Sequence, residues 1–296
     1  MEFGKINAEE LEAIDTSLPG DPPETVPFLN TYRTAATPQI YVGCAKWGRK
    51  DWVGKIYPEG TKESDFLKLY GKHFNSIELN ATFYRLPSKR QTAEWKSKVG
   101  PEFRFCPKVS QSISHIRRLK DVDEAVERFL DGISGFGETL GAVFLMPHPS
   151  MGPKSMDVLE SFISQFPSDI RLFVELRHRQ WFSDPQTTRS SIAVFQQHRV
   201  GVVITDVLGR RDCLHMRLTV PEAFVRFVGN GLHPTDYRRI DDWARRIRQW
   251  TDAGLQKLYF FMHQEDEVHS PELSRYAIER FNAECGLSIP VPQFLS

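Results

Sequence analysis

From residue 40 onward, short apolar runs alternate with longer amphipathic segments, and this alternation constrains the fold more than any other feature of the chain. The apolar runs have the length of strands and lie at 40–45, 76–80, 103–109, 142–147, 171–177, 201–206, 223–228 and 257–263. Segments with helical periodicity follow at 62–72, 88–98, 121–135, 155–165, 187–198, 236–252 and 271–285. Strands and helices in regular succession are typical of repeated βα units on a mainly parallel sheet, so the sequence predicts an α/β fold.

The number of strands favours one closed domain. Eight strands in about 250 residues, with no break in composition, predict a single TIM-like (β/α) barrel over residues 39–296. An open doubly wound sheet is the alternative, but no Gly-x-Gly-x-x-Gly segment follows the first strand. The segment 207–222 is irregular, and we expect it to be an insertion after the sixth strand, with 214–218 as an additional strand.

Residues 1–38 differ from the rest of the chain. Pro19, Pro22 and Pro23 interrupt any long periodic element, whereas Phe28 and Leu29 offer apolar anchors. We therefore expect an extended N-terminal arm that packs on the barrel rather than a disordered tail.

Charge and cysteine content narrow the function classes. Lys and Arg number 38 and so do Asp and Glu, which gives no global electrostatic reason to bind nucleic acid or an anionic membrane. The basic run at 238–248 also contains acidic residues at i,i+4 spacing, which favours a solvated helix over a phosphate-binding patch. No apolar stretch is long enough to cross a membrane. Four widely spaced cysteines and an acidic N-terminal segment without an apolar core predict reduced thiols in a cytoplasmic protein.

Polar residues within the predicted strands share one phase. Side chains on a strand alternate between its two faces, and Glu78, Lys108, Glu175, Arg177 and Arg226 all lie opposite the more apolar face of their strands. They are concentrated toward the C-terminal ends of the strands, where an α/β barrel places its active site. The alternative is that these charges only pair with one another as buried ion pairs, for example Glu175 with Arg226.

Two long segments resemble a known family. They read Glu78-Leu-Asn80-Ala-Thr-Phe-Tyr84-Arg-Leu-Pro87 and Phe173-Val-Glu175-Leu-Arg177-His178-Arg-Gln-Trp181-Phe. With Gly43-Cys-Ala-Lys-Trp47, Phe103-Arg-Phe-Cys-Pro-Lys108 and Ser114-His115, they resemble the mostly bacterial YecE-like proteins, domain of unknown function 72. The resemblance spans about residues 40–285 and implies a TIM-like barrel, but no established activity.

The chain departs from the pattern of that family at two strand ends. The eighth predicted strand reads Tyr259-Phe-Phe-Met-His263-Gln264, where the family has an aromatic residue followed by two asparagines. The seventh ends Arg226-Phe-Val-Gly229-Asn230 in place of Arg-x-His-Gly. These departures put any substrate assignment carried over from relatives in doubt.

The candidate site residues fall into three groups. Glu78 and Glu175 are the acid/base candidates, and His115 is a mobile acid/base group in the loop after the third strand. The basic candidates, which would hold an anion, are Lys108, Arg177 and Arg226. The remaining candidates for substrate binding are Trp47, Asn80, Tyr84, His178, Trp181 and Asp206; the three aromatic residues among them would form a wall that stacks on a sugar or base.

The function hypotheses follow from these groups. The leading one is an acid/base hydrolase or isomerase acting on a small anionic or sugar-like substrate. The alternatives are a metal-dependent phosphodiester-processing enzyme acting on nucleic acid, and a non-catalytic ligand-binding barrel. Glu78, Glu175, His178, Asp206 and His263 carry groups that bind metals, but no closely spaced pair occurs, so we assign no metal ligand and leave the cofactor open.

Overall fold

The computed structural model describes residues 4, 6–11 and 13–295. Its strands are β1 (Gln39–Cys44), β2 (Ser76–Leu79), β3 (Arg104–Pro107), β4 (Val143–Leu145), β5 (Leu172–Val174), β6 (Gly201–Asp206), β7 (Glu222–Gly229) and β8 (Lys257–Gln264). All strand pairs are parallel. The predicted positions of the strands and the α/β class are confirmed.

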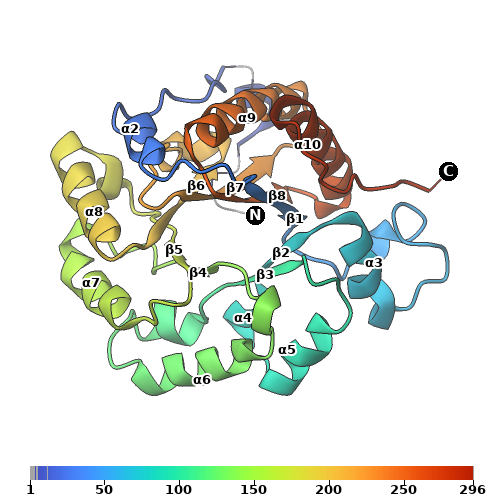
Figure 1. The fold of residues 1–296 in the computed structure, drawn as a ribbon, viewed down its shortest axis with the longest axis horizontal. Helices are drawn as coiled ribbons and strands as arrows, with labels where there is room; N and C mark the ends of the chain where they lie inside the picture. The colour runs from blue at the N-terminus through green and yellow to red at the C-terminus, as the bar shows by residue number, and fades with distance from the viewer. Residues whose placement is uncertain (1–3, 5, 12, 296) are drawn as a thin grey trace.

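The strands form two hydrogen-bonded sheets. Six of them make a curled sheet in the order β1-β8-β7-β6-β5-β4, and β2 and β3 make a second sheet (Figure 1). Between β3 and β4 the pairing is reduced to short contacts, in which the Val109 amide donates to the Phe144 carbonyl over 2.9 Å and Gly141 donates to Phe105 over 2.8 Å. The hydrogen-bonded ladder is therefore not the continuous ring that a fully closed barrel predicts.

Side chains connect β1 to β2. The Asn75 side chain accepts from the Val42 amide over 2.8 Å and donates to the Ile40 carbonyl over 2.9 Å. The Tyr70 hydroxyl accepts from the Cys44 amide and donates to the Ser76 carbonyl. Gly43 is required at this junction, because a Cβ atom there would come within 1.9 Å of the Ser76 carbonyl oxygen. We refer to this contact between β1 and β2 as the seam.

Helices surround the strands (Figure 1). They are α3 (Phe66–His73), α5 (Lys89–Lys96), α6 (Asp123–Ser134), α7 (Met156–Gln165), α8 (Pro185–Gln197), α9 (Pro234–Ala253) and α10 (Ser270–Cys285), so each predicted helical segment overlaps a helix. Ser88 caps α5 by accepting from the Gln91 amide, and Gly254 ends α9 at a φ of 127°. These caps explain why the helices begin and end where they do.

Two apolar cores hold the layers together. The larger one lies between strands and helices. The smaller one joins side chains of seven strands and their flanks, so it fills the inside of the curled sheet; it contains Tyr41, Cys106, Ala142, Phe144, Phe173, Val203, Val220, Phe224, Tyr259 and Phe261. The polar strand residues lie one or two alternations farther along the same strands, at the C-terminal end of this inner core.

The N-terminal segment contacts the outside of the helix layer. It includes two short helices, α1 (Ala8–Leu11) and α2 (Thr25–Asn30). Asp21 accepts from the Trp250 indole over 2.9 Å and pairs with Arg246, both on α9, and Leu29 is fully buried.

The segment after β6 is irregular, as expected, but the additional strand predicted at 214–218 is absent from the described residues. A 3-10 helix, Leu208–Cys213, occupies its first part. Met216 then takes a φ of 53°, in the left-handed region that a strand excludes. The His215 ring contacts the Val203 carbonyl and accepts from the Arg217 amide, which replaces strand pairing locally.

Two further predictions concern the whole chain. No helix in the described ranges is long and apolar enough to cross a membrane. All four cysteines are free thiols, with three buried and Cys285 partly exposed.

Candidate functional site

Arg226 of β7 joins two buried glutamates at the centre of the curled sheet. Its Nε and one terminal nitrogen donate to the two Glu78 carboxylate oxygens over 2.8 and 2.9 Å. The other terminal nitrogen donates to both oxygens of Glu175 over 2.9 Å. All three residues are at most 1% exposed. Bidentate contacts of this kind are the strongest that an arginine makes with carboxylates.

Neighbouring side chains complete the contacts of both carboxylates. Asn80 donates to Glu78 over 2.7 Å, and the His263 ring lies 3.0 Å from the second Glu78 oxygen. Arg177 and Thr205 each donate to Glu175 over 2.9 Å. We call Glu78, Glu175, Arg177, Arg226 and His263 the ionic cluster.

The ionic cluster keeps both glutamates ionised. Burial alone would raise the pKa of Glu78, but Arg226 and His263 hold that pKa well below its usual range. Burial would also raise the pKa of Glu175, but the charges of Arg177, Arg226 and Lys108 outweigh this effect and lower the pKa to about 2. A carboxylate that is ionised and fully hydrogen-bonded at neutral pH cannot act as a general acid. The geometry therefore favours the ion-pair interpretation of Glu78 and Glu175 over the acid/base one.

Lys108, which follows β3 directly, has no such partner. Its side chain is buried, with 7% of its surface exposed, and its Nζ lies 4.4 Å from the centre of the Phe83 ring. The Phe144 ring centre is 5.7 Å away and the Met146 sulfur 3.6 Å away. No oxygen atom of the described residues accepts a hydrogen bond from this ammonium group or forms an ion pair with it. Burial and the nearby Arg226 lower the pKa of Lys108 to about 8.

The site therefore has a surplus of positive charge. Among the described residues, Lys108, Arg177 and Arg226 lie beside the carboxylates of Glu78 and Glu175, and all three cations act on the pKa of Glu175 or Lys108. The Phe144 ring lies between two of the cations, with the Arg226 guanidinium carbon 5.8 Å from its centre.

His115 lies beside Lys108. It belongs to a single π-helical turn, Ser112–Ile116, and its ring contacts the Phe83 ring at a centroid distance of 4.9 Å. The Ser114 hydroxyl is 2.9 Å from its Nδ1. Burial and the charge of Lys108 lower the pKa of His115 to about 4, so the imidazole is neutral near pH 7 and able to accept a proton.

The predicted aromatic wall forms only in part. Tyr84 is 73% exposed and contacts Phe83 edge-on. Trp181 is buried in the outer core and donates its indole N–H to the Met151 carbonyl over 2.9 Å. Trp47 packs against Trp95 of α5. Trp47 therefore anchors its loop against a helix, and Trp181 connects its segment to the loop that contains Met151.

His178 and Asp206 also lie apart from the ionic cluster. His178 accepts from the Gln180 amide at the start of a 3-10 helix, Arg179–Phe182. Asp206 accepts from Trp243 over 2.8 Å and pairs with Arg239 over 2.9 Å, both on α9. Alternation along β6 explains this position, because the side chain that points inward is that of the preceding residue, Thr205.

Several residues near Lys108 and the ionic cluster were not among the predicted site residues. They are Phe83, Phe144, Met146, His148, Thr205 and His263. Side chains on one face of a strand are two residues apart, the rule that placed Arg226 in the interior. By the same rule, Thr205 shares a face with Val203, and His263 shares a face with Tyr259 and Phe261. Phe83 follows β2 within the segment that includes Tyr84, and only the folded structure shows that its ring contacts Lys108.

The metal-binding candidates do not converge in the part of the chain that the structure describes. No group of three His, Cys, Asp or Glu side chains there is arranged to hold an ion. Glu78 and His263 touch, but Arg226 lies between Glu78 and Glu175, and Asp206 faces α9.

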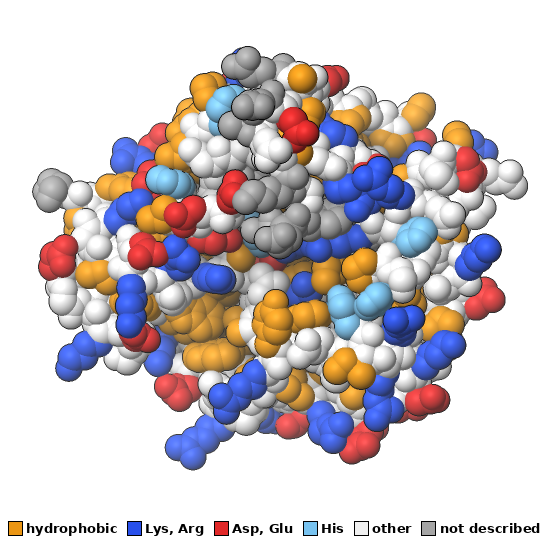
Figure 2. Space-filling view, turned by 180° about the vertical axis from the view of Figure 1, so that it is seen from behind, with side chains coloured by type: hydrophobic (Ala, Val, Ile, Leu, Met, Phe, Trp, Pro, Cys, Tyr) orange, Lys and Arg blue, Asp and Glu red, His pale blue; other side chains and the backbone are white. Residues whose placement is uncertain are grey.

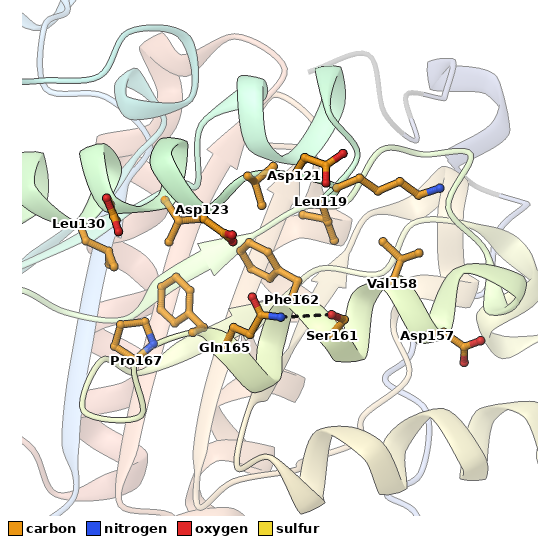
Figure 3. A pocket seen from close by; sticks show the side chains of 15 residues that line it. Leu119, Asp121, Asp123, Leu130, Asp157, Val158, Ser161, Phe162, Gln165 and Pro167 are labelled. Carbon is orange, nitrogen blue, oxygen red and sulfur yellow. Dashed lines mark hydrogen bonds between the residues drawn. The ribbon is translucent and has the colours of Figure 1, made fainter.

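A separate groove of about 650 Å³ lies between α6 and α7. Figure 3 shows apolar side chains such as Leu119 and Phe162 inside it and carboxylates such as Asp121 and Asp157 around it. None of the residues of the ionic cluster lines this groove, and neither does Lys108.

Comparison with known proteins places these features in a family. The family model described as protein of unknown function DUF72 matches residues 41–293. The chain is 27% identical to the UPF0759 protein YecE of Escherichia coli over 252 residues, which cover 79% of this chain and 89% of that protein. It is 28% identical to the UPF0759 protein YunF of Bacillus subtilis over 153 residues, 49% of this chain and 53% of that one.

Solved structures share the fold. A DUF72 family protein from Enterococcus faecalis superposes with a TM-score of 0.66 at 18% identity, covering 87% of this chain and all of its own. A DUF72 family protein from Thermotoga maritima gives a TM-score of 0.63 at 23% identity over 84% of this chain. Because the family model spans most of its length, this chain belongs to the DUF72 family of proteins of unknown function.

Proposed function

We propose that Lys108 and the ionic cluster form the site of an acid/base enzyme, an isomerase or hydrolase, that acts on a small anionic substrate. The observation that carries this proposal is the buried ammonium group of Lys108, which has no oxygen partner among the residues that the structure describes. A buried charge is costly unless it is paired. An anionic substrate would supply the missing partner, and Arg177, whose side chain is 11% exposed, supplies a second cation beside it.

The residues take different roles in this proposal. Glu78 and Glu175 position Arg226 and Arg177 and are not themselves proton donors. Lys108 and His115 exchange protons with the substrate, since their pKa values of about 8 and about 4 make one a proton donor and the other a proton acceptor near neutral pH. The groups that would contact substrate are Asn80, Tyr84 and Arg177. Exposed Tyr84 would allow a sugar-like substrate to stack.

The two other hypotheses have less support. On the face that Figure 2 draws, acidic and basic side chains are interspersed outside the grey residues, whereas a nucleic-acid site needs a basic surface. A protein that only binds a ligand would not need Lys108 and His115, two groups with perturbed pKa values, beside the same Phe83 ring.

The proposal includes the architecture that holds the site. Residues 39–296 would act as one closed TIM-like barrel, with the seam completing the ring, and residues 1–38 would act as an arm on its outside. The side-chain hydrogen bonds of Asn75 and Tyr70 support closure at the seam.

Anion-dependent stability tests the site. At an anion concentration 100-fold above Kd, binding to the folded state alone adds about 2.7 kcal/mol to the free energy of unfolding. We expect sulfate, phosphate or a small carboxylate to stabilise the wild-type protein and to lose this effect in Lys108→Met. The control is Lys68→Met, which removes an exposed lysine on α3. An equal anion response in wild type and Lys108→Met would overturn the proposal. Turnover in an unbiased metabolite screen then separates an enzyme from a binding protein.

A further inference from the structure

We infer that Lys108 is a covalent catalyst that forms an imine with the carbonyl group of its substrate, so that the substrate is a small oxo acid. This inference rests on the proposed anion site and names its substrate class. It goes beyond ion pairing, because it assigns the lysine nitrogen a bond to carbon.

The surroundings of Lys108 suit an amine better than an ammonium ion. Its Nζ is enclosed by the Phe83 ring, the Phe144 ring and the Met146 sulfur, none of which is an oxygen acceptor. A lysine that only balanced charge within the protein would gain from a carboxylate neighbour, and neither glutamate of the ionic cluster makes an ion pair with it. Desolvation and neighbouring cations are what activate lysine nucleophiles.

The neighbouring arginines account for the acid group of the substrate. Arg226 and Arg177 both lie close enough to depress the pKa of Lys108, so an anion bound by them is held beside its amine. Arg226 donates to both carboxylates of the ionic cluster, and Arg177 donates to Glu175. A substrate carboxylate attracted by the positive charge of this region would present the adjacent carbonyl carbon to Lys108.

The step balances without an oxidant or reductant. The Lys108 ammonium group passes one proton to the neutral His115 imidazole, and the freed nitrogen lone pair forms a bond to the carbonyl carbon while the carbonyl π electrons move to oxygen. A second nitrogen-bound proton moves to that oxygen to give a hydroxyl. His115 then donates its proton to the hydroxyl, which leaves as water as the nitrogen lone pair forms the C=N bond. The resulting protonated imine withdraws electrons from the adjacent carbon, which permits the proton shifts of an isomerase. His115 touches the Phe83 ring that Lys108 also covers, so both groups reach one substrate position.

Reductive trapping tests the inference on the full chain. The protein is incubated with pyruvate and cyanoborohydride near pH 7.5, digested and mapped by mass spectrometry. With a pKa of about 8, Lys108 should gain one reduced pyruvate unit about tenfold faster than exposed Lys68, even after allowing for the lower nucleophilicity of the weaker base. Acetone, the same methyl ketone without the carboxylate, should label Lys108 more slowly, and sulfate should suppress the pyruvate reaction.

The Lys108→Arg variant separates this inference from the proposed function. It retains the cation and cannot form the imine, so we expect anion-dependent stabilisation without the adduct. If the arginine variant fails to fold, sulfate stabilisation and labelling of the wild-type protein still separate the two. If wild-type protein is stabilised by sulfate but Lys108 is labelled no faster than Lys68, the imine is refuted and the anion site stands. If sulfate neither stabilises the protein nor slows labelling, the anion site is refuted as well.

Discussion

Replacing Lys108 with methionine should make the protein more stable at neutral pH. The folded state holds the Lys108 pKa at about 8, against a reference value of 10.5, chiefly because the ammonium group is buried. Each unit of difference is worth about 1.4 kcal/mol, so the charged lysine costs the fold about 3 kcal/mol near pH 7. Methionine has a similar length, carries no charge and can keep the contacts with Phe83 and Phe144.

The sign of the pH dependence follows from the same values. Below about pH 8 the lysine is protonated in both the folded and the unfolded state, and the full penalty is present. Between about pH 8 and 10.5 the unfolded state binds more protons, so wild-type stability rises with pH. Above that range the penalty is gone. The advantage of Lys108→Met should therefore shrink from about 3 kcal/mol at pH 7 toward zero near pH 10.5.

Urea denaturation followed by tryptophan fluorescence at pH 7, 8, 9 and 10 measures this advantage. Lys68→Met is the matched control, since its lysine is exposed, and its stability should track that of the wild type across the range. The reasoning fails if Lys108→Met is less stable than the wild type at pH 7, or if the difference between them does not change with pH.

Three further outcomes follow from the contacts. Arg226→Met leaves two buried carboxylates without their shared partner and should lower the free energy of unfolding by about 3–5 kcal/mol, which urea denaturation at neutral pH would detect. Wild-type stability should be lost as pH falls from 4.5 toward 2, the interval over which folded Glu175 stays ionised while the unfolded residue is protonated; in acid titrations Glu175→Gln should lack this component. Asp206→Asn should destabilise the protein, because Arg239 loses the nearer of its two buried carboxylate partners, Asp206 and Asp236, yet leave sulfate stabilisation unchanged in thermal melts.

Much of the site follows from alternation along strands. Glu78, Glu175 and Arg226 were predicted to share an interior, and the structure joins them through four hydrogen bonds of at most 2.9 Å, all donated by Arg226. Period-two alternation is a local property, so it can be read from the sequence wherever a strand is regular.

Other features depend on distant partners. Asp206 was predicted to bind substrate because it ends a strand, but Trp243 and Arg239 of α9 hold it on the helix side. The role of Trp181 depends on the Met151 carbonyl, which comes from a different loop. No local pattern encodes such pairings, which is also why the partition of the strands into two sheets could not be predicted.

The seam should open more easily than the hydrogen-bonded ladders between the other strands. Along a β ladder, many backbone hydrogen bonds hold the two strands together, and the loss of one side chain breaks none of them. At the seam, the amides of Val42 and Cys44 depend on one asparagine and one tyrosine. Hydrogen exchange at these two amides should therefore report fluctuations that the rest of β1 does not share, and the strand assembly should part here first when pulled from its ends.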